Sequence, residues 1–164
     1  MKSEVYNIDC VEFMKTLPDK CFDLAIADPP YGINAANMSN TQSMRNRLQQ
    51  DAGKLKNRIL QIAKKDWDFY PPKKDFFDEL FRVSKNQIIW GGNYFDLPPT
   101  RCFVCWDKVQ PWENFSQVEY AWTSFDYPAQ LFRFDNKTGD KIHPTQKPVS
   151  LYAYLLSKYA QVGG

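Results

Sequence analysis

The 164-residue sequence lacks several features that would assign it to a class of protein at once. No run of about 18 apolar residues occurs, so we expect no segment that spans a membrane. Residues 1–4 contain no apolar signal region, and we therefore expect a cytoplasmic protein. Charge is nearly balanced, because 21 Lys and Arg against 19 Asp and Glu leave a net charge of +2. That balance does not by itself indicate a nucleic-acid binder.

Residues that bind metals are also scarce. The chain has one histidine, His143, and four cysteines. Cys102 and Cys105 have the C-x-x-C spacing of a zinc or redox pair. However, the residues around them are typical of a strand, on which positions three apart face opposite sides. Since no second C-x-x-C pair occurs, we expect no metal site and two reduced strand cysteines.

The most informative feature present is an apolar strand that ends abruptly. Residues 22–27 are nearly all apolar, as in a parallel strand covered on both faces, and Asp28, Pro29, Pro30 and Tyr31 follow. Two consecutive prolines cannot donate to a sheet ladder and hold the turn stiff, so pairing must end there. Open α/β sheets bind ligands at this end of their strands. A carboxylate, prolyl carbonyls and an aromatic ring suit a planar group with an exocyclic amine.

This turn resembles the catalytic motif of amino-methyltransferases, which move a methyl group from S-adenosylmethionine to a nucleobase nitrogen. Alone, an Asp-Pro-Pro turn is also ordinary strand-ending chemistry. Three further segments are similar to segments of that family and occur in its order: YNIDC at residues 6–10, EYAW at 119–122 and HPTQKP at 143–148. Together they resemble the class in which the catalytic motif precedes the cofactor motif.

The resemblance implies a DNA methyltransferase that acts on adenine N6. Asp28 and the carbonyl of Pro29 would accept the two N–H bonds of the amine, and Tyr31 would stack on the base. The base would have to leave the duplex to reach the turn. The cytosine N4 branch more often carries serine in place of the aspartate, so cytosine is the less favoured alternative.

The resemblance also implies a binding site for S-adenosylmethionine. The residues expected to bind it are Asp9, Cys10, Asp28, Thr145, Gln146 and Lys147. Asp9 and the Cys10 backbone would meet the adenine of the cofactor, and residues 145–147 would meet its methionine end or position the next helix. Structural alternatives remain for two of them: Asp9 as a helix cap and Lys147 as a solvated charge.

A basic segment, residues 32–66, directly follows the turn. Its residues 45–66 carry seven positive and two negative side chains. The residues expected to bind DNA phosphates are Arg45, Arg47, Lys54, Lys56 and Arg58. The segment is expected to be a mobile flap beside the catalytic turn, poorly ordered without DNA. The alternative is a solvated loop with one surface helix.

One element of the resembled family has no counterpart. Its glycine-rich turn, F-x-G-x-G, wraps the cofactor, yet the seven glycines of this chain form no G-x-G. Relatives would begin the corresponding strand near residues 163–164, so we expect the half of the sheet that binds most of the adenosyl group to be absent. Two alternatives to an autonomous enzyme follow: a non-catalytic DNA-binding remnant, or one half of an assembly completed by a second chain or a homodimer. Methylation of an RNA or a protein amide also fits the turn.

The expected fold is a three-layer, Rossmann-like α/β methyltransferase sheet, mostly parallel with a late antiparallel hairpin and incomplete at the C-terminus. Residues 1–164 would form a single partial catalytic domain. Strands are expected at residues 4–8, 22–27, 87–90, 102–106, 117–123 and 130–134, the last three as a run of antiparallel strands. Helices are expected at 10–17, 73–84 and from 148 onward, and the last has an apolar stripe of Leu151, Tyr152, Leu155, Leu156 and Tyr159. In this fold strand 22–27 would have an unpaired edge, which residues 4–8 or a second chain would cover.

Overall fold

The computed structural model describes residues 3–33, 68, 70–110, 116–135 and 146–160. Five expected DNA contacts and one cofactor contact lie outside these residues: Arg45, Arg47, Lys54, Lys56, Arg58 and Thr145.

The chain divides into two compact units. One contains Met1–Pro29, Pro72–Thr138 and Lys147–Gly164, and the other contains Pro30–Pro71 and Gly139–Gln146. All the helices and strands of the described residues belong to the first unit.

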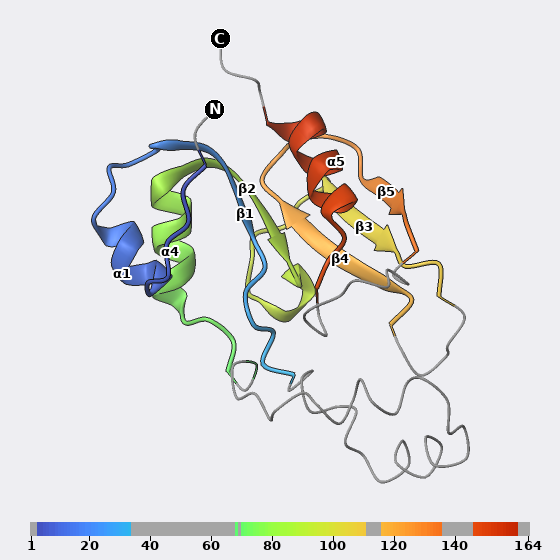
Figure 1. Ribbon diagram of the computed structural model, residues 1–164, viewed down its shortest axis with the longest axis horizontal. Helices are drawn as coiled ribbons and strands as arrows, with labels where there is room; N and C mark the ends of the chain where they lie inside the picture. The colour runs from blue at the N-terminus through green and yellow to red at the C-terminus, as the bar shows by residue number, and fades with distance from the viewer. Residues whose placement is uncertain (1–2, 34–67, 69, 111–115, 136–145, 161–164) are drawn as a thin grey trace, which may run out of the picture. The chain divides into compact units, whose positions relative to one another are not determined.

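An open five-stranded sheet organises the first unit (Figure 1). Its strands are β1 (Phe22–Ala27), β2 (Ser84–Trp90), β3 (Phe103–Asp107), β4 (Val118–Thr123) and β5 (Gln130–Arg133), in the order β1-β2-β4-β3-β5. The β1–β2 and β3–β5 pairs are parallel, whereas β2–β4 and β3–β4 are antiparallel. A mixed α/β sheet with a late antiparallel pair is thus confirmed. The expectation that β5 would also pair antiparallel was wrong.

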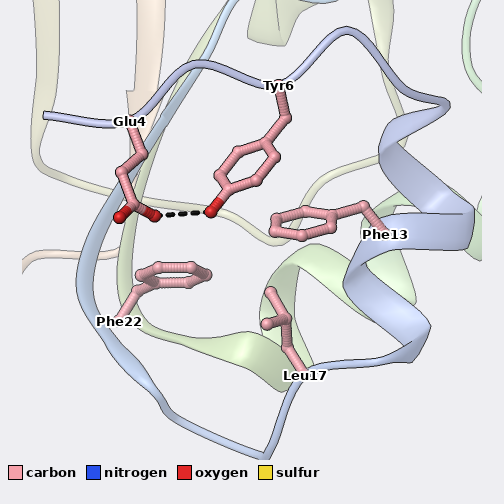
Figure 2. Close-up of a pocket in the computed structure, with 5 residues that line it drawn as sticks. All are labelled: Glu4, Tyr6, Phe13, Leu17 and Phe22. Atoms are coloured by element: carbon pink, nitrogen blue, oxygen red, sulfur yellow. Dashed lines mark hydrogen bonds between the residues drawn. The ribbon is translucent and has the colours of Figure 1, made fainter.

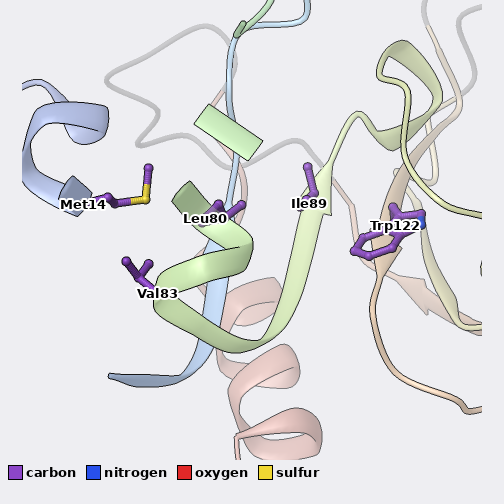
Figure 3. Packing of buried hydrophobic residues seen from close by; sticks show 5 residues of the cluster. All are labelled: Met14, Leu80, Val83, Ile89 and Trp122. Atoms are coloured by element: carbon purple, nitrogen blue, oxygen red, sulfur yellow. The ribbon is translucent and has the colours of Figure 1, made fainter. Parts of the chain in front are cut away.

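Helices cover the face of the sheet on which Ile89 lies. Helix α1 (Cys10–Lys15) and helix α4 (Lys74–Val83) pack there, and the core cluster that joins them to the sheet consists of Met14, Leu80, Val83, Ile89 and Trp122 (Figure 3). Burial of such apolar side chains is the main favourable contribution to folding.

Helix α5 (Val149–Tyr159) lies on the opposite face, where the ring of its Tyr154 packs 4.9 Å from that of Phe132 in β5. Successive strand residues alternate between faces, so Trp90 points away from the face of Ile89. The ammonium of Lys147, two residues before α5, lies 5.2 Å from the centroid of the Trp90 ring. Within the expected apolar stripe of this helix, Leu151, Leu155 and Tyr159 are buried, but Leu156 is half exposed.

Local sequence accounts for the ends of several elements. Asp9 caps α1, because its Oδ1 accepts the N–H groups of Val11 at 2.9 Å and Glu12 at 3.0 Å. After β2, Gly91 has a φ of 70°, and a Cβ on Gly92 would lie 2.5 Å from the Cβ of Trp122. Gly91 thus allows a tight turn here, and Gly92 lets the main chain approach Trp122 closely.

The strand expected at residues 4–8 was wrong. This segment is irregular and leaves Val5, Tyr6 and Ile8 exposed, so its apolar side chains do not form a buried strand face. Strand β1 is instead an edge strand that pairs only with β2 among the described strands, and it is partly exposed rather than covered on both faces.

The four cysteines are free thiols. Among the residues that the structure describes, no group of His, Cys, Asp and Glu side chains could hold a metal ion. None of the described helices is both long enough and apolar enough to cross a membrane.

Candidate active site at the end of strand β1

The acid-Pro-Pro-Tyr turn begins where the β1 ladder stops. The last pair of the parallel β1–β2 ladder joins Ala27 to Ile89, and Asp28 follows directly. Pro29 is buried, whereas the side chain of Asp28 is 33% exposed. The carboxylate is therefore fixed at the carboxyl end of a strand, with part of its surface open to a ligand.

A buried lysine holds this carboxylate. Nζ of Lys147 donates to both carboxylate oxygens of Asp28 at 2.7 Å, and the lysine side chain is only 4% exposed. The interpretation of Lys147 as a solvated surface charge is therefore wrong. The two residues are 119 positions apart, so the tertiary fold alone brings them together.

The same ammonium has two further neighbours. It lies 3.2 Å from Oε2 of Glu119, an ion-pair contact, and it faces the ring of Trp90. Cation–π attraction is strongest over tryptophan and grows where water is excluded. Lys147 thus joins the ends of three strands, since Asp28 follows β1, Trp90 closes β2 and Glu119 lies in β4.

Glu119 continues the network to a second lysine. Nζ of Lys108 lies 2.6 Å from Oε1 of Glu119, so negative and positive groups alternate from Asp28 through Lys147 and Glu119 to Lys108. Burial by itself raises the pKa of Glu119, but the two ammonium groups outweigh this and hold it below its usual value. The site therefore holds two carboxylates without leaving a buried charge unpaired.

The carboxylates of Asp28 and Glu119 both affect the phenol of Tyr152 in helix α5. Burial, then the carboxylates of Asp28 and Glu119, raise the pKa of its phenol to about 12. The hydroxyl therefore remains protonated at neutral pH and can act as a hydrogen-bond donor.

Among the described residues, two buried polar atoms have no hydrogen-bond partner, Nε1 of Trp90 and Oγ of Ser150, and Oε2 of Glu119 has only the 3.2 Å ion-pair contact with Lys147. Trp90 and Glu119 flank the ammonium, and Ser150 lies three residues after it in the chain. Buried polar groups are rarely left unpaired, and such groups often mark a place for water or a ligand. Together they offer two donors and one acceptor.

The expected adenine-binding residues lie at the start of α1. Asp9 makes the capping bonds described above, as its structural alternative predicted. Cys10 is exposed, and partial burial of its sulfur, then the charge of Asp9, raise the pKa of its thiol. Gln146 is half-buried and belongs to the second unit.

Within the second unit, an aspartate that sequence reasoning had missed contacts the main chain directly after Pro30. Asp68 is 2% exposed, and its Oδ1 accepts the backbone N–H groups of Tyr31 at 2.7 Å and Gly32 at 3.0 Å. Nothing in the sequence around Asp68 indicates that its hydrogen-bond partners lie 36 and 37 residues earlier.

A separate hollow of about 460 Å³ lies toward the other end of β1. It is lined by Glu4, Tyr6, Phe13, Leu17 and Phe22 (Figure 2). Tyr6 stacks on Phe13 with ring centroids 4.9 Å apart and donates to Glu4 at 2.5 Å. Phe22 opens β1 whereas Asp28 follows its last residue, so this hollow is not part of the site around Asp28.

No known protein-family model matches this chain. The residues and contacts of the site itself are therefore the basis for assigning a function.

Proposed function

We propose that this chain carries the catalytic turn of an S-adenosylmethionine-dependent DNA methyltransferase that acts on adenine N6. One observation supports the proposal above all others. Asp28, Glu119 and Lys147 come from three separate segments that each resemble this family, and they meet in one buried charge network. Segments matched by chance would have no reason to converge on the same ammonium.

The proposed reaction needs positioning and electrostatics rather than a covalent intermediate. An exocyclic amine is a poor nucleophile because its lone pair is delocalised into the ring. Asp28 and the carbonyl of Pro29 would accept the two N–H bonds and draw the nitrogen toward tetrahedral geometry. Pro30 keeps this turn stiff. Tyr31 would stack on the base, an interaction worth about 1–3 kcal/mol.

Lys147 orients the acceptor in this scheme. Its two hydrogen bonds fix the plane of the Asp28 carboxylate. An ionised carboxylate has about four lone-pair sites, so it can still accept a hydrogen bond from the amine. The exposed third of the side chain is where the base would approach.

The residues around Lys147 also fit the α-amino carboxylate end of S-adenosylmethionine. The unpartnered N–H of Trp90 and hydroxyl of Ser150 could donate to its carboxylate, and Oε2 of Glu119 could accept from its ammonium. When bound, the cofactor supplies a methyl group on a positively charged sulfur. At the other end, Oδ1 of Asp9 already accepts two capping bonds, so a contact with the adenine would use Oδ2 or the Cys10 backbone.

DNA is the proposed partner, and the basic segment after Tyr31 provides the positive charge. Its residues Arg45, Arg47, Lys54, Lys56 and Arg58 are proposed to contact phosphates. Each phosphate contact contributes about 0.9 to the slope of log affinity against log salt. Replacing the five residues with glutamine should flatten that slope, and an unchanged slope would remove the segment from the DNA-binding surface.

The rival proposals are a non-catalytic DNA-binding protein, one half of an enzyme completed by a second chain, and cytosine N4 methylation. Two observations favour the second chain among these. The sequence contains no G-x-G turn, and the outer edge of β1 carries no strand among the described residues.

One experiment separates these proposals. The chain is incubated with duplex DNA and S-adenosylmethionine labelled in its methyl group, the DNA is digested to nucleosides, and cofactor affinity is measured by calorimetry. Labelled N6-methyladenine would support the proposal. Labelled N4-methylcytosine would show that the target is cytosine N4 instead. Cofactor binding without methyl transfer would favour a missing partner. DNA binding with neither transfer nor cofactor binding would indicate a non-catalytic protein.

A further inference from the structure

The main chain directly after the acid-Pro-Pro turn is held by a buried carboxylate. Oδ1 of Asp68 accepts the consecutive N–H groups of Tyr31 and Gly32 at 2.7 and 3.0 Å. Gly32 has a φ of 72°, in the left-handed region. Successive N–H groups around such a residue form a concave anion-binding nest, and here the anion is a side chain of the same unit.

A second close contact joins the same two segments of the chain. A Cβ on Gly32 would lie 2.6 Å from Cδ of Pro71 and 3.0 Å from its nitrogen. The chain therefore passes against Gly32 too closely for any side chain at that position. Asp68 and Pro71 thus attach residues 31–32 to residues 68–71, and we call this pair of contacts the staple.

A contact that only joined the two segments would not need a buried charge. Burying a carboxylate is costly, and apolar packing could join two segments without that cost. A carboxylate instead fixes the directions of two peptide groups, because each N–H must point at its oxygen. The peptide groups fixed in this way are those of Tyr31 and the residue after it.

We propose that Asp68 is a positioning residue, which sets the direction in which Tyr31 presents its ring to the target base. The inference builds on the proposed function, in which Tyr31 stacks on that base. Asp68 acts through the main chain of Tyr31 and need not touch the substrate. It therefore extends the site to a residue that no sequence motif indicates.

The staple itself can be tested without any ligand. Amide hydrogen exchange of Tyr31 and Gly32 is measured by NMR in the wild-type chain and in Asp68→Ala, Asp68→Asn and Asp78→Ala. We expect Asp68→Ala to lower protection at both amides at least tenfold. Asp68→Asn should lower it less, because the amide oxygen can still accept, and it provides a second variant should the alanine form fail to fold.

Asp78→Ala is the matched control, because Asp78 is an exposed helical carboxylate that pairs with Lys74. It should leave both amides unchanged. Equal protection in wild type and in folded Asp68 variants would overturn the staple.

The functional part is tested with a single-stranded oligonucleotide carrying 2-aminopurine, whose fluorescence is quenched by stacking. We expect Tyr31→Ala and Asp68→Asn each to reduce quenching at saturation, and the double variant to be no worse than Tyr31→Ala. That non-additivity would show that Asp68 acts through Tyr31.

Additive losses would overturn the positioning role, and so would full quenching in Asp68→Asn. If the wild-type chain binds the oligonucleotide without quenching, base stacking by Tyr31 fails together with its positioning. The exchange experiment would still decide separately whether the staple exists.

Discussion

The two ends of strand β1 differ sharply in chemistry. At its carboxyl end, Asp28 enters a buried network with Lys147 and Glu119. At its start, Phe22 lies beside an open hollow lined mostly by apolar groups, and it is itself 43% exposed. One strand therefore connects a polar, ion-paired site to an apolar surface that the described residues leave uncovered.

The contrast indicates which end of β1 suits a reaction site and which end suits contact with another chain. Burying charged groups costs free energy unless partners compensate them. A function would explain why the fold nevertheless buries the charged groups around Lys147. Exposed apolar side chains beside an open strand edge are typical of surfaces that bind another chain.

The largest expected effect is loss of methyl transfer in Asp28→Ala. Under the proposed mechanism, removal of the Asp28 carboxylate should lower the rate at least about 100-fold, as for other transition-state hydrogen-bond partners. The matched control is Asp23→Ala at the other end of β1, because Asp23 is an exposed carboxylate paired with Lys85. Labelled methyl transfer measures both. More than a tenth of the wild-type rate in folded Asp28→Ala would remove Asp28 from the mechanism.

The next largest effect is a loss of stability in Lys147→Met. Methionine keeps most of the apolar stem but leaves Asp28 without its ammonium and Glu119 with one lysine. The free energy of unfolding should fall by about 1–3 kcal/mol, toward the lower figure because Asp28 is partly solvated.

Urea denaturation measures this loss, with Lys85→Met as the control. Lys85 pairs with Asp23 on the surface, and its replacement should change stability by less than about 0.5 kcal/mol. Equal effects of the two substitutions would show that the buried network has no special role.

A third prediction concerns association through the apolar end. If a second copy covers this surface, light scattering of the wild-type chain should give more than the monomer mass. The double variant Val5→Lys with Phe22→Lys should restore the monomer, because both side chains are exposed and tolerate charge without loss of core packing. A monomeric wild-type chain would instead require a different partner or none.

The smallest expected effect is the response of stability to acid. The pKa of Glu119 is lower in the folded state than its ordinary value of 4.5, so its ion pairs contribute their full stability above about that pH. The contribution is lost as pH falls below 4.5 through the folded-state pKa. Glu119→Gln should therefore flatten the decline of stability below pH 4.5. An identical decline in both proteins would contradict the pairing.

Several local features could be predicted from the sequence. The bounds of β1 agree with the apolar run at 22–27, because two prolines after Asp28 permit no further pairing. The N-cap of α1 by Asp9 and the buried positions of α5 also follow from short-range patterns. In each case the physical cause lies within a few residues of the effect.

Other features depended on partners distant in the sequence. Residues 4–8 have the composition of a strand, yet a strand exists only if another backbone lies beside it. The parallel pairing of β5 with β3 likewise follows from where the chain returns, which the sequence of β5 does not record. The role of Asp68 depends on two N–H groups more than 35 residues away.

By itself, the sequence determined where the acid-Pro-Pro-Tyr turn occurs and that a stiff, strand-ending acceptor would be found at Asp28. The tertiary structure alone decided that Lys147 holds that acceptor, that Glu119 and Trp90 share the same ammonium, and that Asp68 accepts the N–H groups of Tyr31 and Gly32. The physical reason is the distance along the chain over which each effect acts. Proline stereochemistry acts on adjacent residues, whereas the choice of one ammonium among 21 positive side chains depends on which of them the fold buries beside the carboxylate.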